Sequence, residues 1–240
     1  MKLTYIYHSC FALETDKLTI IFDYFKDSGE ALHSGPVNDY LLMRPGKLYV
    51  LSSHSHYDHF NKEILQWKQR RSDIQYILSK DILDCKKARG QDAIFIDKGE
   101  TFEDDNLFIK AFGSTDAGIS FLVEVDDKKI FHAGDLNNWH WNEESTPEEV
   151  REAEDFYLRE LETLAEYTSQ LTLAMFPVDP RLGKDYMRGA EQFVSRIQTK
   201  IFVPMHFDEE YGKANAFKEY AEAHGCRFIS LTHKGETIEV

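Results

Sequence analysis

Six consecutive residues bring together the side chains that a metal site needs. Positions 54–59 read His-Ser-His-Tyr-Asp-His. The four potential ligands in this segment are His54, His56, Asp58 and His59. Neutral imidazole and carboxylate groups are the ligands of zinc, iron and manganese. The apolar run at 48–51 comes shortly before the segment and predicts a buried strand. Packing does not explain so many ligating groups at the end of a strand, so the pattern indicates a metal centre.

Two later strands end in residues of the same kind. Asp135 follows an apolar run and Gly134, a residue that allows the backbone to turn the carboxylate back over the edge of a sheet. His206 ends the apolar run that starts at 201. A site for two metal ions takes its ligands from several segments and leaves room for water. We therefore expect three distant strand ends to meet at one sheet edge.

The remaining sequence predicts the elements that position these residues. Short apolar or alternating runs predict strands, mostly in the first half, and helical spacing alternates with strands in the second half. The predicted strands span residues 3–7, 10–14, 18–23, 47–52, 74–78, 93–96, 107–112, 119–125, 129–132, 171–178, 201–203, 227–231 and 236–240. The predicted helices span residues 61–70, 148–166, 185–199 and 213–224. This order favours sheets inside and helices outside.

Composition limits the class of protein. A chain of 240 residues, 42% apolar and 29% charged, suits a single globular domain over 1–240. No stretch approaches ~20 apolar residues and the first residues lack a signal region, so we expect no membrane span and no secretion. Three widely spaced cysteines fit a reducing cytoplasm. A formal net charge of −14 disfavours nucleic acid and leaves a small molecule as the expected partner.

The order of the ligands resembles the metallo-β-lactamase superfamily of metallohydrolases. Its signature is His-x-His-x-Asp-His, then Gly-Asp after a strand, then a late His. Segments 7–11 and 20–23, and the Asp-Pro-Arg-Leu-Gly run at 179–183, resemble the branch related to ascorbate-phosphate lactonases. The resemblance covers nearly the whole chain. It implies an α/β (α+β) fold, a four-layer αββα sandwich with two sheets inside, helices outside and the metal site at one sheet edge.

The resemblance also implies a role for each matching residue. The implied metal ligands are His54 and His56 for a first ion, Asp58, His59 and His206 for a second, and Asp135 as the bridge. Asp58 and Asp135 are the expected catalytic residues, and Asp23 would orient a ligand without binding metal. His8 stands where relatives have a residue near the pocket. A hydroxide between the ions would attack the substrate, because coordination lowers the pKa of water from ~16 toward ~7.

The chain departs from the family pattern in one segment. The family has a further histidine just before the strand predicted at 119–125, whereas residues 113–118 read Gly-Ser-Thr-Asp-Ala-Gly. Either Asp116 or a hydroxyl replaces it, or water fills the place, or the first site is weak; Asp116 is equally well interpreted as a turn residue. More oxygen ligands favour manganese, iron or magnesium over zinc. We expect one or two divalent ions per chain (Zn, Mn or Fe), with the second site the firmer.

The predicted function is metal-dependent hydrolysis of a small-molecule ester, lactone or phosphoester through a metal-bound hydroxide. Two alternatives stay open. A phosphodiesterase or nuclease of the same fold would require a basic groove, which the acidic composition disfavours. A metal-binding protein with a degraded active site is suggested by the absent histidine. The sequence makes no prediction of the oligomeric state.

Overall fold

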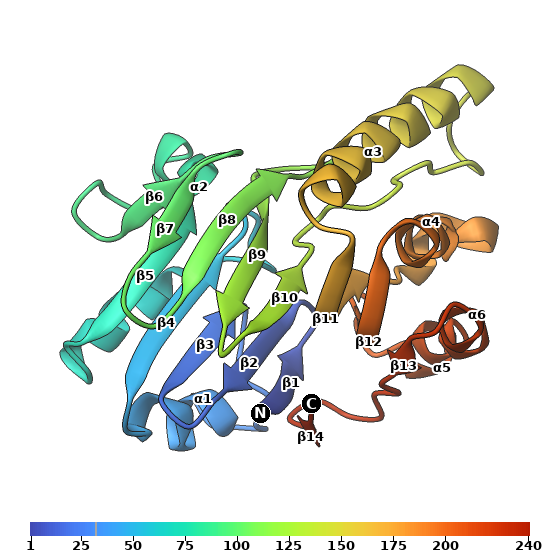
Figure 1. Cartoon of the computed structure of the whole chain (residues 1–240). Coiled ribbons are helices and arrows are strands. Elements are labelled where there is room, and N and C mark those ends of the chain that lie inside the picture. The colour runs from blue at the N-terminus through green and yellow to red at the C-terminus, as the bar shows by residue number, and fades with distance from the viewer. Residues whose placement is uncertain (32) are drawn as a thin grey trace. The chain divides into compact units, whose positions relative to one another are not determined.

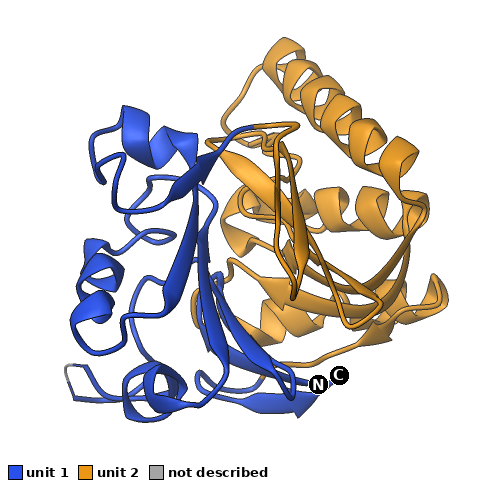
Figure 2. Ribbon diagram, turned by 60° about the vertical axis from the view of Figure 1, so that its left-hand side comes forward, with its two compact units in different colours: residues 1–97, 232–240 blue, residues 98–231 orange. Residues whose placement is uncertain are grey.

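The chain divides into two compact units, each built on one sheet. The computed structural model describes residues 1–31 and 33–240. Unit 1 contains Met1–Asp97 and Thr232–Val240, and unit 2 contains Lys98–Leu231 (Figure 2). Each unit holds one sheet of seven strands. The prediction of a single domain over 1–240 stays a prediction.

Unit 1 contains a mixed sheet with the strand order β14-β1-β2-β3-β4-β5-β6. Its strands are β1 (Lys2–Tyr7), β2 (Cys10–Glu14), β3 (Leu18–Phe22), β4 (Lys47–Ser52), β5 (Ile74–Ser79), β6 (Ile94–Ile96) and β14 (Thr237–Glu239). The strands from β14 to β3 pair antiparallel, and those from β3 to β6 pair parallel. Because β3 and β4 point the same way, Asp23 and the 54–59 segment emerge at the same edge of the sheet.

Short helices cover one face of this sheet. They are α1 (Pro36–Asp39), η1 (Leu41–Met43), η2 (Lys62–Gln69) and α2 (Lys80–Asp84). The helix predicted at 61–70 forms as η2, a 3₁₀ helix, whose N-cap Asn61 accepts a hydrogen bond from the Glu63 N–H at 2.9 Å. Ile64 and Trp67 of η2 are buried in the core cluster under the sheet. These contacts hold the segment that follows the 54–59 turn.

Unit 2 contains a second mixed sheet with the order β13-β12-β11-β10-β9-β8-β7. Its strands are β7 (Thr101–Glu103), β8 (Phe108–Gly113), β9 (Ile119–Val125), β10 (Lys128–His132), β11 (Gln170–Pro177), β12 (Gln198–Met205) and β13 (Arg227–Phe228). β7 to β10 pair antiparallel and β10 to β13 pair parallel. Asp126 and Asp127 make the two-residue turn between β9 and β10, both with positive φ (48° and 57°), which is typical of a tight hairpin.

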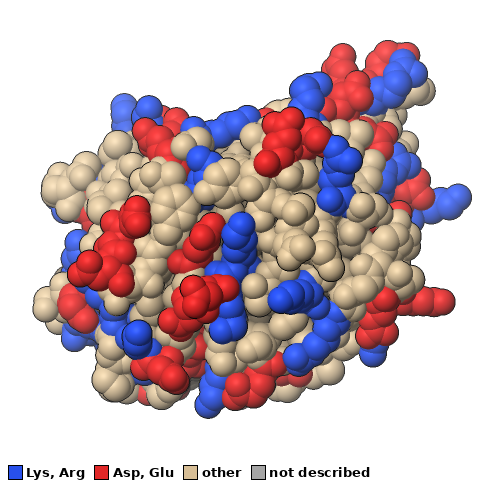
Figure 3. Space-filling view, viewed as in Figure 1, with Lys and Arg blue, Asp and Glu red and all other residues tan. Residues whose placement is uncertain are grey.

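Helices of different lengths, including one of 21 residues, pack on the sheet of unit 2. They are α3 (Pro147–Tyr167), η3 (Pro180–Asp185), α4 (Arg188–Arg196), α5 (Tyr211–Asn215) and α6 (Lys218–Ala223). Figure 1 shows α3 as the long yellow helix and α4 in orange beside β11 and β12. α3 begins with a capping box between Thr146 and Glu149, followed by a proline at its first position. Acidic and basic side chains interleave along α3 on the face shown in Figure 3.

The predicted fold class, α/β with helix-covered sheets, is confirmed. Some predicted boundaries are wrong. The helix predicted at 185–199 ends at Arg196, and β12 begins at Gln198, because parallel pairing with β11 recruits polar residues that sequence alone does not mark as strand. The helix predicted at 213–224 forms as the two short helices α5 and α6. Within residues 1–31 and 33–240, no helix combines the length and apolar character needed to cross a membrane.

Candidate metal centre

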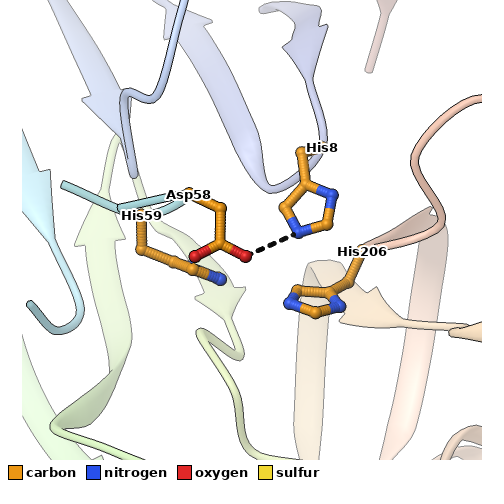
Figure 4. A group of neighbouring side chains, drawn as sticks. All are labelled: His8, Asp58, His59 and His206. Carbon is orange, nitrogen blue, oxygen red and sulfur yellow. Dashed lines mark ion pairs between the residues drawn. The ribbon is translucent and has the colours of Figure 1, made fainter. Parts of the chain in front are cut away.

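Unit 1 gathers five of the predicted residues into one group, which we call the unit 1 cluster. The cluster consists of His8, His54, His56, Asp58 and His59. Ligand atoms of His54 and His56 lie within 4.8 Å of each other, and those of His8, Asp58 and His59 lie within 4.8 Å of one another. Figure 4 shows Asp58 and His59 on the segment after β4, with His8 on the turn after β1. The backbone N–H groups of His59 and Phe60 donate to the His56 carbonyl and coil the segment tightly.

Asp23 holds the unit 1 cluster from behind. Its fully buried carboxylate accepts hydrogen bonds from the Ser53 N–H (2.7 Å) and the Ser53 hydroxyl (2.6 Å), and it lies 2.7 Å from His59 Nδ1. The Ser53 hydroxyl also lies 3.0 Å from His54 Nδ1. An imidazole held through Nδ1 presents Nε2 as its ligand atom, and metal-binding histidines are commonly oriented by a carboxylate in this way.

His8 reaches the cluster from the turn between β1 and β2. Its Nε2 lies 3.4 Å from Asp58 Oδ2, and its backbone N–H donates to the Tyr5 hydroxyl at 3.0 Å. Burial by itself raises the pKa of the Asp58 carboxyl. The hydrogen bond from His8 and the neighbouring charge of His59 outweigh it, so this pKa lies below its usual range. Asp58 is therefore a carboxylate at neutral pH, the form that binds cations.

Unit 2 brings together three further predicted residues, Asp116, Asp135 and His206, which we call the unit 2 cluster. Asp135 Oδ1 lies 3.3 Å from His206 Nε2. A ligand oxygen of Asp116 lies within 4.8 Å of a ligand oxygen of Asp135. Asp135 follows β10 and His206 follows β12, on either side of the parallel strand β11, so both emerge at the same sheet edge.

Asp179 supports His206 as Asp23 supports His59. It follows β11, and its buried carboxylate lies 2.9 Å from His206 Nδ1. The Arg181 guanidinium donates to both oxygens of the same carboxylate, with its Nε at 3.0 and 2.9 Å. Burial raises the pKa of the Asp179 carboxyl, but its bonds to His206 and Arg181 outweigh burial and lower this pKa to about 2. Nε2 of His206 is thereby the nitrogen that faces Asp135.

The backbone around Asp135 is held from several sides. Gly134 has a φ of 53°, as expected for the turn that redirects the carboxylate, and its N–H donates to His132 Nδ1 at 3.2 Å. The Trp139 indole N–H donates to the Asp135 carbonyl at 2.8 Å, and the Thr115 hydroxyl lies 3.2 Å from the same oxygen. The loop that carries the predicted bridging carboxylate is therefore fixed in one conformation.

Three of the residues in and behind these clusters adopt left-handed backbone conformations. The φ angles are 56° for His8, 44° for Asp23 and 63° for His206. A residue other than glycine costs about 1 kcal/mol or more in this region. Such strain persists where the surrounding contacts determine the conformation, and it concentrates at functional sites.

Sequence reasoning did not assign a role to several residues that hold the clusters. Asp179 stood out only as part of a family-like run, and nothing marked Ser53 or Thr115. The available signal was an aspartate within two residues of the end of a buried strand, a feature that Asp179 shares with Asp23. His140 belongs to no motif in the sequence, and the structure buries it, with Nε2 3.1 Å from the Asp185 carbonyl.

The donor set fits divalent metal ions. In each unit a buried imidazole is held through Nδ1 by a buried aspartate and presents Nε2 beside a carboxylate. Nitrogen and oxygen donors of this kind bind zinc, iron and manganese, and the outer aspartates match the usual support of metal-binding histidines.

Comparison with known proteins identifies the family. A model described as a beta-lactamase superfamily domain matches residues 2–150. The chain belongs to the metallo-β-lactamase superfamily. A UPF0173 protein of Pyrococcus abyssi (strain GE5 / Orsay) is 24% identical over 222 residues, which cover 90% of this chain and 87% of that protein.

Solved structures share the fold. Igni18, a metallo hydrolase from Ignicoccus hospitalis KIN4/I, has a TM-score of 0.70 at 21% identity, with 99% of this chain and 97% of that chain covered. CmlA, a diiron β-hydroxylase from Streptomyces venezuelae, has a TM-score of 0.68 at 14% identity, with 100% and 54% covered. The predicted metallo-β-lactamase-like fold and the predicted class, a metal-dependent hydrolase of this superfamily, are confirmed. The lactonase-like branch stays a prediction.

Proposed function

We propose that the chain binds one or two divalent ions through residues of the unit 1 cluster and the unit 2 cluster, and that it hydrolyses an ester, lactone or phosphoester of a small molecule. The proposed ligands are His54, His56, Asp58, His59, Asp135 and His206, with His8 and Asp116 as additional candidates. One observation carries the proposal: His59 and His206, on different units, are held in the same way by the buried aspartates Asp23 and Asp179.

The protein's own residues prepare this chemistry. Bound ions would acidify a water molecule and polarise the bond under attack. Asp23 and Asp179 fix the tautomers of their histidines, so that each Nε2 keeps its lone pair. The depressed pKa of Asp58 keeps that carboxyl ionised at neutral pH. The hydrogen bonds that Asp135 receives at its carbonyl hold the backbone from which its carboxylate projects, which favours a fixed ligand geometry.

We propose further that Asp116 takes the place of the absent histidine. Its carboxylate lies near that of Asp135 in unit 2. An additional oxygen donor would favour manganese or iron over zinc at the first position. The diiron protein CmlA has the same fold, which supports including iron among the ions to be tested.

The test compares Asp58→Ala with the intact chain. Both are stripped of metal, reloaded with Mn²⁺, Zn²⁺ or Fe²⁺, and assayed with an aryl ester, a lactone and an aryl phosphodiester. Because Asp58→Ala removes a proposed metal ligand, activity should fall by more than the ~10–100-fold typical when a residue that only supports a ligand is removed. Asp105→Ala is the matched control, because Asp105 is exposed between β7 and β8.

Each outcome separates the possible functions. Activity that survives Asp58→Ala unchanged removes the proposed centre. Ions that bind tightly without turnover of any substrate favour a metal-binding protein with a degraded site. Preferential cleavage of nucleic acid favours the nuclease alternative.

A further inference from the structure

Unit 2 contains a small cavity beside the segment that carries Asp135. Its volume is about 300 Å³. The lining residues are Thr115, Trp139, Glu149, Glu152, Ala153 and Phe156. They come from the β8–β9 connection, the segment after β10 and the first turns of α3. This volume lies at the small end of the range for ligand sites, so the cavity suits one chemical group of a ligand.

Two walls of the cavity also hold the unit 2 cluster. The Trp139 indole N–H donates to the Asp135 carbonyl at 2.8 Å, and the Thr115 hydroxyl lies 3.2 Å from the same oxygen. The Trp139 ring lies edge-on to the ring of His206, with centroids 5.5 Å apart. A group bound against Trp139 therefore sits next to two of the proposed metal ligands of the same unit.

The lining has the chemistry of a cation site. Trp139 is half-buried and stacks on Trp141, with ring centroids 6.3 Å apart. Phe156 leaves 39% of its surface exposed, and the Arg159 guanidinium lies 5.8 Å from its ring centroid, so this ring already attracts a cation. Glu149 and Glu152 add two carboxylates, and the lining residues named above include no lysine or arginine. Hydrogen bonds from the backbone and side chain of Thr146 lower the pKa of Glu149, which stays ionised while it caps α3. Aromatic faces together with carboxylates attract ammonium groups.

We propose that this cavity binds a substituted ammonium group. This inference rests on the proposed function: the substrate is a small ester, lactone or phosphoester that carries an alkylammonium group. The ammonium group is the part of the substrate that does not react. Trp139 and Phe156 contact the alkyl substituents, and Glu152 supplies the opposite charge. Trp139 links this binding to the Asp135 segment.

Binding is tested with three probes of nearly equal shape on the full chain, first without metal and then with Zn²⁺, which is diamagnetic and leaves NMR signals near the ion visible. Choline is the cation, 3,3-dimethyl-1-butanol its neutral isostere and 3,3-dimethylbutanoate an anion. The chain has three tryptophans, and Trp139→Phe assigns the indole N–H NMR signal of Trp139. We expect choline to shift this signal and to bind at least ~5-fold more tightly than either other probe, within the range of cation–π contacts.

Variants on one helix separate the cavity from general charge. Glu152→Gln and Phe156→Leu should each weaken choline binding by ~3-fold or more. Glu148→Gln removes the same charge from the same turn but lies outside the lining, beside Arg151, and should leave choline binding unchanged. Equal binding of the three probes, tighter binding of the anion, or an equal loss in Glu148→Gln would overturn the proposal.

A substrate pair connects the cavity to the reaction. The Mn²⁺-loaded chain should hydrolyse acetylcholine with a kcat/KM at least ~5-fold above that for 3,3-dimethylbutyl acetate. In Glu152→Gln, the ratio of these two kcat/KM values should be smaller. If choline binds as expected and neither ester is hydrolysed, the cavity stands and the proposed function fails. If both esters are hydrolysed equally and choline does not shift the Trp139 signal, the cavity fails and the proposed function stands.

Discussion

The two clusters are assembled by different means. In unit 1, four of the five residues come from the single segment 54–59, which the backbone coils by local hydrogen bonds. In unit 2, the residues come from the β8–β9 connection and from the ends of β10 and β12, separated by β11. The first arrangement depends mainly on a local turn, whereas the second depends on strand register in a parallel sheet. The same side-chain chemistry can therefore be either local or tertiary in origin.

The aspartates behind the clusters differ in a similar way. Asp23 is fully buried and receives two hydrogen bonds from Ser53 in addition to its contact with His59. Asp179 shares its charge between His206 and Arg181, whose side chain is 53% exposed. In unit 1, the carboxylate that supports the histidine is thus shielded from solvent together with its partners. In unit 2, Arg181, one partner of the supporting carboxylate, is partly in contact with solvent.

The largest expected effect tests whether both clusters serve one centre. Asp135→Asn in unit 2 and Asp58→Asn in unit 1 should each lower both metal affinity and hydrolysis by more than ~100-fold, since each removes a charged ligand at nearly constant volume. Metal content by mass spectrometry and steady-state kinetics measure the two effects. If one variant loses activity and the other keeps it, the clusters do not act together.

A smaller effect compares the two supporting aspartates. Asp23→Asn and Asp179→Asn should each weaken metal binding ~10–100-fold, and Asp23→Asn should also destabilise the fold by about 1–3 kcal/mol. The amide cannot accept hydrogen bonds at both positions where Asp23 now does. Chelator competition gives the affinities and urea unfolding gives the free energies. If Asp179→Asn lost more unfolding free energy than Asp23→Asn, Asp179 and not Asp23 would be the aspartate that contributes more to stability.

Asp116→His tests the departure of unit 2 from the family pattern. An imidazole in place of the carboxylate should raise the affinity for Zn²⁺ relative to Mn²⁺ by ~10-fold, because it replaces an oxygen donor with nitrogen. Competition between the two ions, followed by metal analysis, measures the ratio. Ser114→His places the same side chain two residues earlier and should not change it. An unchanged ratio in Asp116→His would exclude position 116 from the ligand set.

The smallest expected effect concerns the support of Asp135 in unit 2. Thr115→Val keeps the shape of the side chain but removes the hydroxyl that contacts the Asp135 carbonyl and accepts the Asn137 N–H at 2.9 Å. The cost should be about 1 kcal/mol in unfolding free energy, with a loss of metal affinity of a few-fold. Thr101→Val, on the exposed edge of β7, is the control. No difference between the two variants would show that the hydroxyl does not position Asp135.

Most strands could be predicted because their apolar runs are local signals. β2, β4 and β9 match the predicted bounds at Cys10–Glu14, Lys47–Ser52 and Ile119–Val125. The beginning of β12 could not be predicted from the sequence, because Gln198 and Lys200 adopt strand conformation only through pairing with β11. β7 was missed for the same reason, since its three residues, of which Thr101 and Glu103 are exposed, gain their conformation from pairing with β8.

In the candidate site too, some residues have a local sequence signal and others depend on contacts between distant segments. The sequence displays the 54–59 segment directly, because its ligands are contiguous, and Asp135 and His206 each end an apolar run. The support of His206 by Asp179 depends on the contact between the ends of β11 and β12, and the pairing of Arg181 with Asp179 depends on the turn at η3. No local pattern encodes such contacts. The roles assigned to these residues stay predictions until the variants are measured.

The pairing of β14 with β1 has a consequence for how the chain folds. Unit 1 takes its edge strand from residues that the ribosome adds after all of unit 2, and β14 then pairs with Leu3 and its neighbours (Figure 2). During synthesis, the sheet of unit 2 can form while β1 still exposes an unpaired edge. Exposed edges promote aggregation, so the edge of β1 is a site for unwanted pairing with other chains until residues 232–240 cover it.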